Sequence, residues 1–450
     1  MIPNIFKAYD IRGLVGIELT KQFAFSTGVA FAKFLELERE PATVVIGEDM
    51  RPSSPELADA FSAGVTSQGL DVIRIGLAST DMLYFAAGKL NLPGAMFTAS
   101  HNPAEYNGIK LCLSGARPIG KESGLLTIEK FVREGVPVSL RPVGKENTQE
   151  MLSQYVDYLL SLVDISGIRK LNIVVDAGNG MAGHTAPAVF KRMNVDVTEM
   201  FYELDGTFPN HEANPIDEEN LKDLKKMVKA KKADIGLAFD GDADRCFLVD
   251  EKGRAVNPSL LTALIADREL KKKPSSPIIY NLISSRAVRE VVEENGGKPL
   301  RSRVGHSFIK AMMAESGAIF GGEHSGHFYF AEFWRADSGM LAALHAIAAL
   351  GETDKTLSEL LAPYARYFAS GEINSKVSNS SAIMAQLKES YGARPGVTTD
   401  ELDGLTVDGD TWWFNVRASN TEPLLRLNVE AKTQSQMEAL RDEVLAAIRG

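Results

Sequence analysis

Cysteine is almost absent from this sequence, since its 450 residues include only Cys112 and Cys246. Two thiols cannot build the disulfide framework of a small secreted domain, and they fit a structural role in a reducing compartment better than a zinc site. The sequence also lacks an apolar run of about 18 residues, and its start, MIPNIFKAYDIRG, lacks the apolar core of a signal peptide. We therefore expect a cytoplasmic protein with no membrane partner.

Basic clusters are scarce as well. There are 49 Lys and Arg against 59 Asp and Glu, which gives a net charge of −10, and Lys271–Lys273 is the one basic run that stands out. Binding to nucleic acid requires a basic face that displaces counterions, so we expect no nucleic-acid partner. An anionic ligand would have to be held by a few well-placed arginines.

Nucleotide-binding signatures are also missing, because the sequence has no Walker motif and no dinucleotide fingerprint. DAGNGMAG at 176–183 follows an apolar run, but its glycines have the wrong spacing, and it is typical of a strand-to-helix turn.

Short apolar runs rich in β-branched residues alternate with segments of helical period. ATVVIGED at 42–49, for example, precedes a helix-like segment and then DVIRIGLA. This is the strand–helix–strand pattern of parallel or mixed sheets, and it occurs in three blocks. The last block instead pairs strand-like runs and ends with an amphipathic helix. The pattern predicts three α/β domains with mixed sheets and a C-terminal α+β domain, with the ranges 1–147, 148–252, 253–363 and 364–450.

An acidic loop lies between two apolar runs in DIGLAFDGDADRCFLVD at 234–250. Asp240, Asp242 and Asp244 would repel one another unless a cation lay among them, and hard oxygen ligands suit Mg²⁺ or Ca²⁺. An EF-hand requires glycine at its sixth position, where Arg245 stands, and flanking helices. The loop therefore predicts a Mg²⁺ site, with Arg245 beside it to pair with a phosphate.

A polar segment follows the apolar run that ends at Phe97. FTASHNP at 97–103 places Thr98, Ser100, His101 and Asn102 together before a proline. The segment is typical of a turn that ends a strand. It also carries a candidate nucleophilic or phosphorylated serine, Ser100.

GGEHSGH at 321–327 also separates two apolar runs. Glu323 and Ser325 could bind neighbouring hydroxyls of a sugar, whereas a glycine-rich turn and a zinc site made of Glu323, His324 and His327 are the alternatives. His306, in the nearby VGHS, is a weaker candidate that could be either structural or functional.

RASNTEPLLR at 417–426 interrupts two strand-like runs. Arg417, Ser419, Asn420 and Thr421 supply a guanidinium, two hydroxyls and an amide, which is the chemistry of a phosphate cradle. A well-capped turn is the alternative reading.

The motifs AYDIRG, TASHNP, DGDADR, GEHSGH and RASNTEP, in this order over nearly the whole chain, resemble the α-D-phosphohexomutase superfamily. Within that superfamily the chain is similar to bacterial phosphomannomutases, including those with dual phosphomannomutase/phosphoglucomutase specificity. The resemblance implies a heart-shaped molecule of four domains with a central cleft. It also implies a soluble monomer or homodimer whose ligands are hexose phosphates.

The resemblance assigns a role to each motif. Ser100 would be the phosphoserine, whose phosphate completes the Mg²⁺ site of Asp240, Asp242 and Asp244. The remaining roles would be a charge-stabilising Arg245, hydroxyl recognition by Glu323 and Ser325, phosphate binding by Arg417, Ser419, Asn420 and Thr421, and positions lining the site at Tyr9, Arg12 and Lys110.

The implied activity interconverts mannose 6-phosphate and mannose 1-phosphate through phospho-Ser100, with hexose 1,6-bisphosphate as intermediate and activator. Lys110, His101 and His327 are the candidate general bases. His324 stands where dual-specificity relatives resemble GEMSGH, phosphoglucomutases GEESFG and phosphoglucosamine mutases GEQSGH, so glucose and glucosamine phosphates stay open as substrates. A Mg²⁺-dependent phosphatase and a catalytically silent sugar-phosphate-binding homologue are the rival hypotheses.

Overall fold

The computed structural model describes residues 5–418 and 424–450. The chain divides into two compact units. Unit 1 contains Met1–Pro258 and Ser325–Leu360, and unit 2 contains Ser259–His324 and Leu361–Gly450. Parts of the predicted block 253–363 therefore belong to each of the two units. The four predicted domain ranges stay predictions.

The first sheet of unit 1 has the strand order β1-β5-β4-β2-β3-β7, and β6 pairs with β5. Strands β2, β3, β4 and β7 are joined by parallel pairs, whereas β5 is antiparallel to β1 and β4, so the sheet is mixed as predicted. The strands are β1 Ile11–Leu14, β2 Thr43–Glu48, β3 Asp71–Leu77, β4 Gly94–Phe97, β5 Tyr106–Leu113, β6 Arg117–Pro118 and β7 Glu146–Thr148. The helices are α1 Lys21–Leu37, α2 Ser54–Ser67, α3 Thr80–Leu90 and α4 Leu126–Glu134.

Helix α1 shows why these segments fold as they do. The Thr20 hydroxyl accepts a hydrogen bond from the Phe23 N–H and so caps the first turn. Phe31, Phe34 and Leu35 follow at helical spacing and are buried in the core that α1 shares with α2 and the sheet.

The second sheet of unit 1 has the order β11-β10-β8-β9. Strand β8 is parallel to β9 and β10, whereas β10 and β11 form an antiparallel hairpin. Its elements are β8 Leu171–Asp176, β9 Val195–Met200, β10 Ile235–Phe239 and β11 Cys246–Asp250, with α5 Leu152–Leu162, α6 Ala182–Phe190 and α7 Lys222–Lys231. Unit 1 also holds β15 Phe328–Phe330, β16 Ala336–Asp337 and the buried helix α11 Gly339–Gly351.

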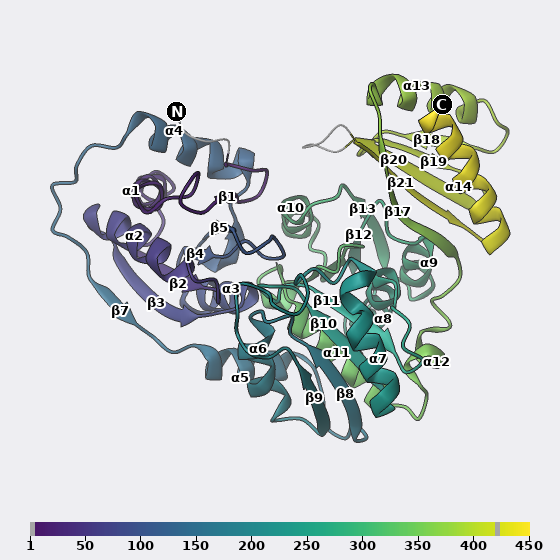
Figure 1. The fold of residues 1–450 in the computed structure, drawn as a ribbon, viewed down its shortest axis with the longest axis horizontal. Helices are drawn as coiled ribbons and strands as arrows, with labels where there is room; N and C mark the ends of the chain where they lie inside the picture. Colours follow the sequence, from purple (N-terminus) through teal and green to yellow (C-terminus); the bar gives the residue numbers. More distant parts are fainter. Residues whose placement is uncertain (1–4, 419–423) are drawn as a thin grey trace. The chain divides into compact units, whose positions relative to one another are not determined.

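Unit 2 contains the parallel strands β13-β12-β14 and an antiparallel sheet of order β17-β21-β20-β19-β18. Helices α13 and α14 share one apolar core with the antiparallel sheet, which confirms the predicted α+β module (Figure 1). The strands are β12 Pro277–Asn281, β13 Lys298–Ser302, β14 Phe320–Gly322, β17 Phe368–Lys376, β18 Thr398–Asp400, β19 Leu405–Asp408, β20 Trp412–Ala418 and β21 Leu424–Ala431. The helices are α8 Pro258–Lys272, α9 Arg286–Glu294, α10 His306–Ser316, α13 Ser380–Gly392 and α14 Gln434–Arg449, and α12 Leu357–Leu361 spans the boundary between the units.

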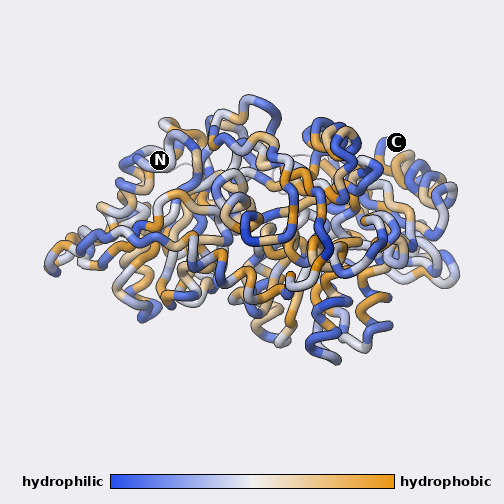
Figure 2. Tube along the Cα trace, turned by 90° about the horizontal axis from the view of Figure 1, so that it is seen from below, coloured by the Kyte–Doolittle hydropathy of each residue, from blue (hydrophilic) through white to orange (hydrophobic). Residues whose placement is uncertain are grey.

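Hydrophobic and hydrophilic stretches alternate along the trace over short distances (Figure 2). In residues 5–418 and 424–450, no helix combines the length and apolarity that crossing a membrane requires. Both cysteines are buried and unbridged.

A buried carboxylate joins distant segments of unit 1. Asp81, near the start of α3, accepts hydrogen bonds from the hydroxyls of Tyr155 (2.7 Å), Ser338 (2.6 Å) and Ser79. Burial raises the pKa of Asp81 to about 6, because few groups other than these hydroxyls replace the water that the carboxylate has lost.

We expect Tyr155→Phe to lower the free energy of unfolding by about 1–3 kcal/mol, because it removes a donor from a buried acceptor. Tyr158→Phe, on the same helix, is the matched control, since the Tyr158 hydroxyl donates to the uncharged backbone carbonyl of Glu332. Urea denaturation of both variants measures the difference. Equal losses of unfolding free energy in the two variants would show that the hydrogen bond to Asp81 stabilises the fold no more than the one to the Glu332 carbonyl.

Candidate active site

The acidic loop connects β10 and β11, as the two apolar runs predicted. Asp240, Asp242 and Asp244 are at most 2% exposed, and one oxygen from each lies within 4.8 Å of the others. Within the described part of the chain, Asp242 Oδ1 and Asp244 Oδ1 are buried and have no hydrogen-bond partner. Three converging carboxylates with unpaired oxygens fit a hard divalent cation such as Mg²⁺.

Lys110, on β5, contacts this loop. Its Nζ lies 2.6 Å from both Asp242 Oδ2 and Asp244 Oδ2. Burial lowers the pKa of Lys110, but the two carboxylates outweigh burial and raise the pKa well above its ordinary value. Burial likewise favours a raised pKa at Asp242, yet the Lys110 ammonium lowers it. Lys110 therefore holds its proton in this arrangement and is a poor proton acceptor.

The TASHNP segment begins directly after β4 and brings Ser100 to the acidic loop. Ser100 Oγ donates a hydrogen bond to Asp240 Oδ2 at 2.8 Å, and the Ser100 N–H donates to Thr98 Oγ1 at 2.9 Å. Ser100 has φ = 51°, in the left-handed region that costs a serine energy and is commonly found at functional sites. The TASHNP segment and the acidic loop, which were predicted to act together, are thus in direct contact.

His101 follows Ser100, and its Nδ1 lies 3.2 Å from Ser100 Oγ. Desolvation, and then the positive charges of Arg245 and Arg12, lower the pKa of His101 well below its ordinary value. The ring is therefore neutral at neutral pH and only weakly basic.

Two arginines surround this pair of loops. Arg245 Nε donates to Asp240 Oδ2 at 2.7 Å, and in the described chain its Nη2 is buried without a hydrogen-bond partner. Arg12, on β1, contacts Asp10 and the Asn102 side-chain oxygen. Tyr9 precedes β1 and is half-buried. A guanidinium with an unused donor beside Ser100 suits an anionic group on that serine.

The GEHSGH segment lies partly in each unit. In unit 1, Ser325 Oγ lies 2.9 Å from His327 Nδ1, and His327 Nε2 lies 3.7 Å from Asp244 Oδ1 and 3.9 Å from Asp337 Oδ2. The groups of described residues that could share a metal ion are the three loop aspartates and the set Asp244, His327 and Asp337. His327 is thus placed next to the acidic loop.

In unit 2, Glu323 is 2% exposed and follows β14. Its Oε2 accepts hydrogen bonds from the Gly305 N–H (3.1 Å) and from Asn281 Nδ2 (3.3 Å). His306, the first residue of α10, is therefore next to a residue that contacts Glu323. Burial lowers the pKa of His324, so this ring too is neutral at neutral pH.

Arg417 lies near the end of β20, where the predicted phosphate loop begins. Its Nη2 lies 3.1 Å from Glu372 Oε2, and Arg426, its register partner on β21, lies 3.4 Å from Glu372 Oε1. Two guanidiniums that share one carboxylate leave a net positive charge for an anion. Ser419, Asn420 and Thr421 lie outside the described residues.

Sequence reasoning missed two polar neighbours. Arg426 closes the quoted motif, but only the strand register places it opposite Arg417. Thr80 Oγ1 donates to Asp242 Oδ2 at 2.6 Å, across 162 residues of sequence, and no local pattern signals this contact.

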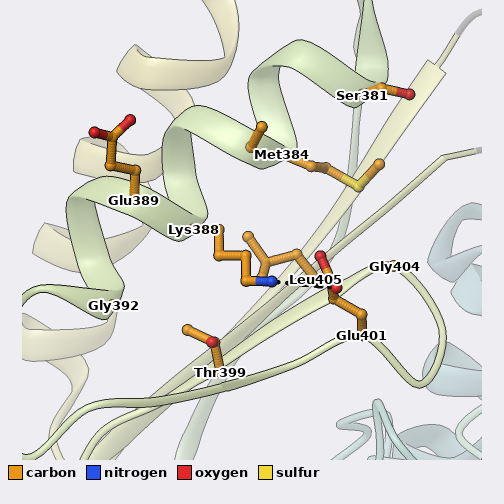
Figure 3. A pocket seen from close by; sticks show the side chains of 10 residues that line it. Ser381, Met384, Lys388, Glu389, Gly392, Thr399, Glu401, Gly404 and Leu405 are labelled. Carbon is orange, nitrogen blue, oxygen red and sulfur yellow. Dashed lines mark ion pairs between the residues drawn. The ribbon is translucent and has the colours of Figure 1, made fainter.

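A cavity of about 810 Å³ lies within unit 2, between α13 and the β18–β19 region (Figure 3). Lys388 on the helix points towards Glu401, and the pair is joined at 3.2 Å. The ion pair balances its own charge, and the lining offers no arginine for a phosphate.

Known proteins resemble the chain over its full length. The four domain models of the phosphoglucomutase/phosphomannomutase family match it in order: α/β/α domain I at residues 3–136, domain II at 153–253, domain III at 257–367 and the C-terminal domain at 372–447.

Individual relatives agree with these matches. A Xanthomonas campestris protein described as "Phosphohexose mutases" is 40% identical over 448 residues, covering 99% of each chain. An Escherichia coli phosphomannomutase is 39% identical over 456 residues, again covering 99% of each. The crystal structure of a phosphoglucomutase/phosphomannomutase family protein from Burkholderia thailandensis is 32% identical, with a TM-score of 0.91 over 99% of this chain and 97% of that one.

Proposed function

Because the chain belongs to the phosphoglucomutase/phosphomannomutase family, we propose that it is a phosphohexomutase that interconverts mannose 6-phosphate and mannose 1-phosphate. The observation that carries this proposal is the 2.8 Å hydrogen bond from Ser100 Oγ to Asp240 within the three-carboxylate loop. A serine beside a divalent-cation site is suited to carry a phosphoryl group, whereas a serine without a base is a poor nucleophile.

In this proposal Ser100 begins the cycle phosphorylated. A hydroxyl oxygen of the hexose monophosphate attacks the phosphorus and the bond from phosphorus to Ser100 Oγ breaks. The hydroxyl proton passes to a base, and the departing Ser100 Oγ takes up a proton. The product is a hexose 1,6-bisphosphate. Ser100 Oγ then attacks the phosphorus of the other phosphoryl group, and the bond from that phosphorus to its sugar oxygen breaks. The Oγ proton passes to the base and the sugar oxygen takes up a proton, so that phosphate is conserved.

Charge on the transferring group is stabilised by positive groups near Ser100. Asp240, Asp242 and Asp244 would hold Mg²⁺, which supplies charge neutralisation for the phosphoryl oxygens. The unused Nη2 donor of Arg245 is available to the same oxygens. Phosphoserine carries about −1.5 to −2 charge, so beside three carboxylates it requires the cation and the guanidinium to offset that charge.

The surroundings of His101, Lys110 and His327 narrow the choice of the group that accepts the proton. His101 has a lowered pKa, and the raised pKa of Lys110 keeps its proton in place while Asp242 and Asp244 contact it. The side chain of His327 is 21% exposed, against 13% for Lys110, and its Nδ1 is oriented by Ser325. We therefore assign the proton transfer to His327.

Substrate recognition would use the remaining polar loops. Glu323, held by two N–H donors, can accept hydrogen bonds from sugar hydroxyls, with Ser325 and His306 as further contacts. Arg417 with Ser419, Asn420 and Thr421 would bind the phosphate that does not react, and Arg426 adds a second guanidinium. Tyr9 and Arg12 would line the site near Ser100.

One experiment tests the function as a whole. Purified protein is incubated with Mg²⁺, a trace of glucose 1,6-bisphosphate, and either mannose, glucose or glucosamine 1-phosphate, and is followed by intact mass, peptide mapping and ³¹P NMR. We expect an adduct of about 80 Da on Ser100 and isomerisation without phosphate release, fastest with mannose. Net phosphate release would instead support a phosphatase. The absence of both the adduct and turnover would support a silent binding protein.

A further inference from the structure

Arg51 lies in the segment after β2, and its side chain is fully buried. Its guanidinium donates four hydrogen bonds to backbone carbonyls of the segment that carries Ser100. Nη2 donates to the carbonyls of Ser100 (2.9 Å) and Asn102 (2.6 Å), and Nη1 donates to those of Pro103 and Tyr106 (both 2.8 Å). One side chain thus collects four carbonyls of a seven-residue stretch.

The guanidinium is itself held in place. Its Nε lies 3.3 Å from Asp49 Oδ2, while Asp49 Oδ1 accepts hydrogen bonds from the Arg51 N–H and the Ser54 hydroxyl. The ring of Phe208, from the segment that follows β9, lies 5.1 Å from Arg51 Cζ. The two Nη groups of the planar fork thus donate to four carbonyls while Nε stays ion-paired with Asp49, which a lysine ammonium with three donors cannot reproduce.

This arrangement explains how Ser100 keeps its left-handed backbone. A non-glycine residue persists at φ = 51° only when its surroundings over-determine the conformation. Arg51 supplies that constraint at the Ser100 carbonyl, and Ser100 Oγ consequently faces Asp240. Among the described residues, Arg51 donates no hydrogen bond to Ser100 Oγ or to an oxygen of the acidic loop, so it acts through the backbone.

We infer that Arg51 is a positioning residue whose guanidinium fixes the 98–106 segment so that Ser100 can receive and donate a phosphoryl group. The inference rests on the proposed function, because it gives the positioned serine its role. It adds a residue, distant in sequence from every motif, that sets the geometry of the transfer.

The test compares Arg51→Ala and Arg51→Lys with Arg74→Ala. Arg74 is a matched control, since it is a largely buried arginine of the same sheet that pairs with Glu48 and Asp59, away from the Ser100 segment. Each protein is assayed for the rate of Ser100 phosphorylation by glucose 1,6-bisphosphate, for kcat and KM, and for amide hydrogen exchange over 98–106.

We expect Arg51→Ala to lower the phosphorylation rate and kcat by about 10²-fold with little change in KM, because a misplacement of about 1 Å has an effect of that size. Millimolar guanidinium should restore part of the activity of Arg51→Ala and none in Ser100→Ala. Arg51→Lys should exchange amides faster over 98–106 while exchange elsewhere in the sheet is unchanged.

The inference is overturned if Arg51→Ala and Arg74→Ala lose activity equally, or if guanidinium fails to rescue a folded Arg51→Ala. Should Arg51→Ala not fold, Arg51→Lys decides, and unchanged exchange and turnover in that variant overturn the inference. A wild-type protein that takes up no phosphoryl group contradicts the proposed function instead, so the two failures are distinguishable.

Discussion

Replacement of Ser100 by alanine should lower mutase turnover by a factor on the order of 10⁴–10⁶, which is the scale on which removal of a nucleophile acts. Ser100 Oγ is the proposed carrier of the phosphoryl group, and it donates a 2.8 Å hydrogen bond to Asp240 Oδ2. Stability should change little, by about 1 kcal/mol, because the variant removes one hydrogen bond to a buried carboxylate.

The measurement is the isomerisation rate after priming with glucose 1,6-bisphosphate, together with urea unfolding. Ser62→Ala is the matched control. Ser62 is also a buried serine of unit 1, but its hydroxyl donates a hydrogen bond to Glu146. Near-full turnover of a folded Ser100→Ala protein would contradict the phosphoserine assignment. Phosphate release by that variant, without isomerisation, would indicate a phosphatase that uses the acidic loop directly.

Local features of the site could be predicted because they are written in adjacent residues. Apolar runs on both sides of Asp240–Arg245 predicted the strands β10 and β11, and alternating carboxylates in the loop between them predicted a cation site. GAMF before TASHNP predicted a buried strand that ends just before Ser100, and this strand is β4. The family resemblance rested on these same motifs and is confirmed by the four domain matches.

The groups that support the site could not be predicted in this way. Arg51 lies two residues after GED at 47–49, which by itself is an ordinary strand end, and its carbonyl partners lie about 50 residues away. Asp81 is joined to Ser338 across 257 residues, and no periodicity encodes that contact. Such partners are set by how strands and helices pack, so they emerge only with the fold.

Gly241 is another residue whose role is set by the packing of the fold, and its substitution should have a large effect on turnover. A Cβ atom on Gly241 would lie 2.3 Å from the Ser100 carbonyl oxygen, well inside any carbon–oxygen contact. Neither backbone can easily withdraw, since the Gly241 carbonyl accepts the Met181 N–H at 2.9 Å and the Ser100 carbonyl accepts Arg51. The acidic loop and the serine segment approach this closely only because residue 241 has no side chain.

We therefore expect Gly241→Ala to lower kcat by about 10²–10³-fold, because it separates Ser100 from the carboxylates that would hold the cation, without removing any reacting group. The backbone shift should also lower the free energy of unfolding by about 1–3 kcal/mol. Gly392→Ala is the matched control, since its Cβ would meet nothing closer than Thr399 at 3.6 Å. Steady-state kinetics at saturating Mg²⁺ measure the effect. Wild-type kcat in Gly241→Ala would mean that the two loops need not touch during turnover, and the contact between Ser100 and Asp240 would then lose its place in the mechanism.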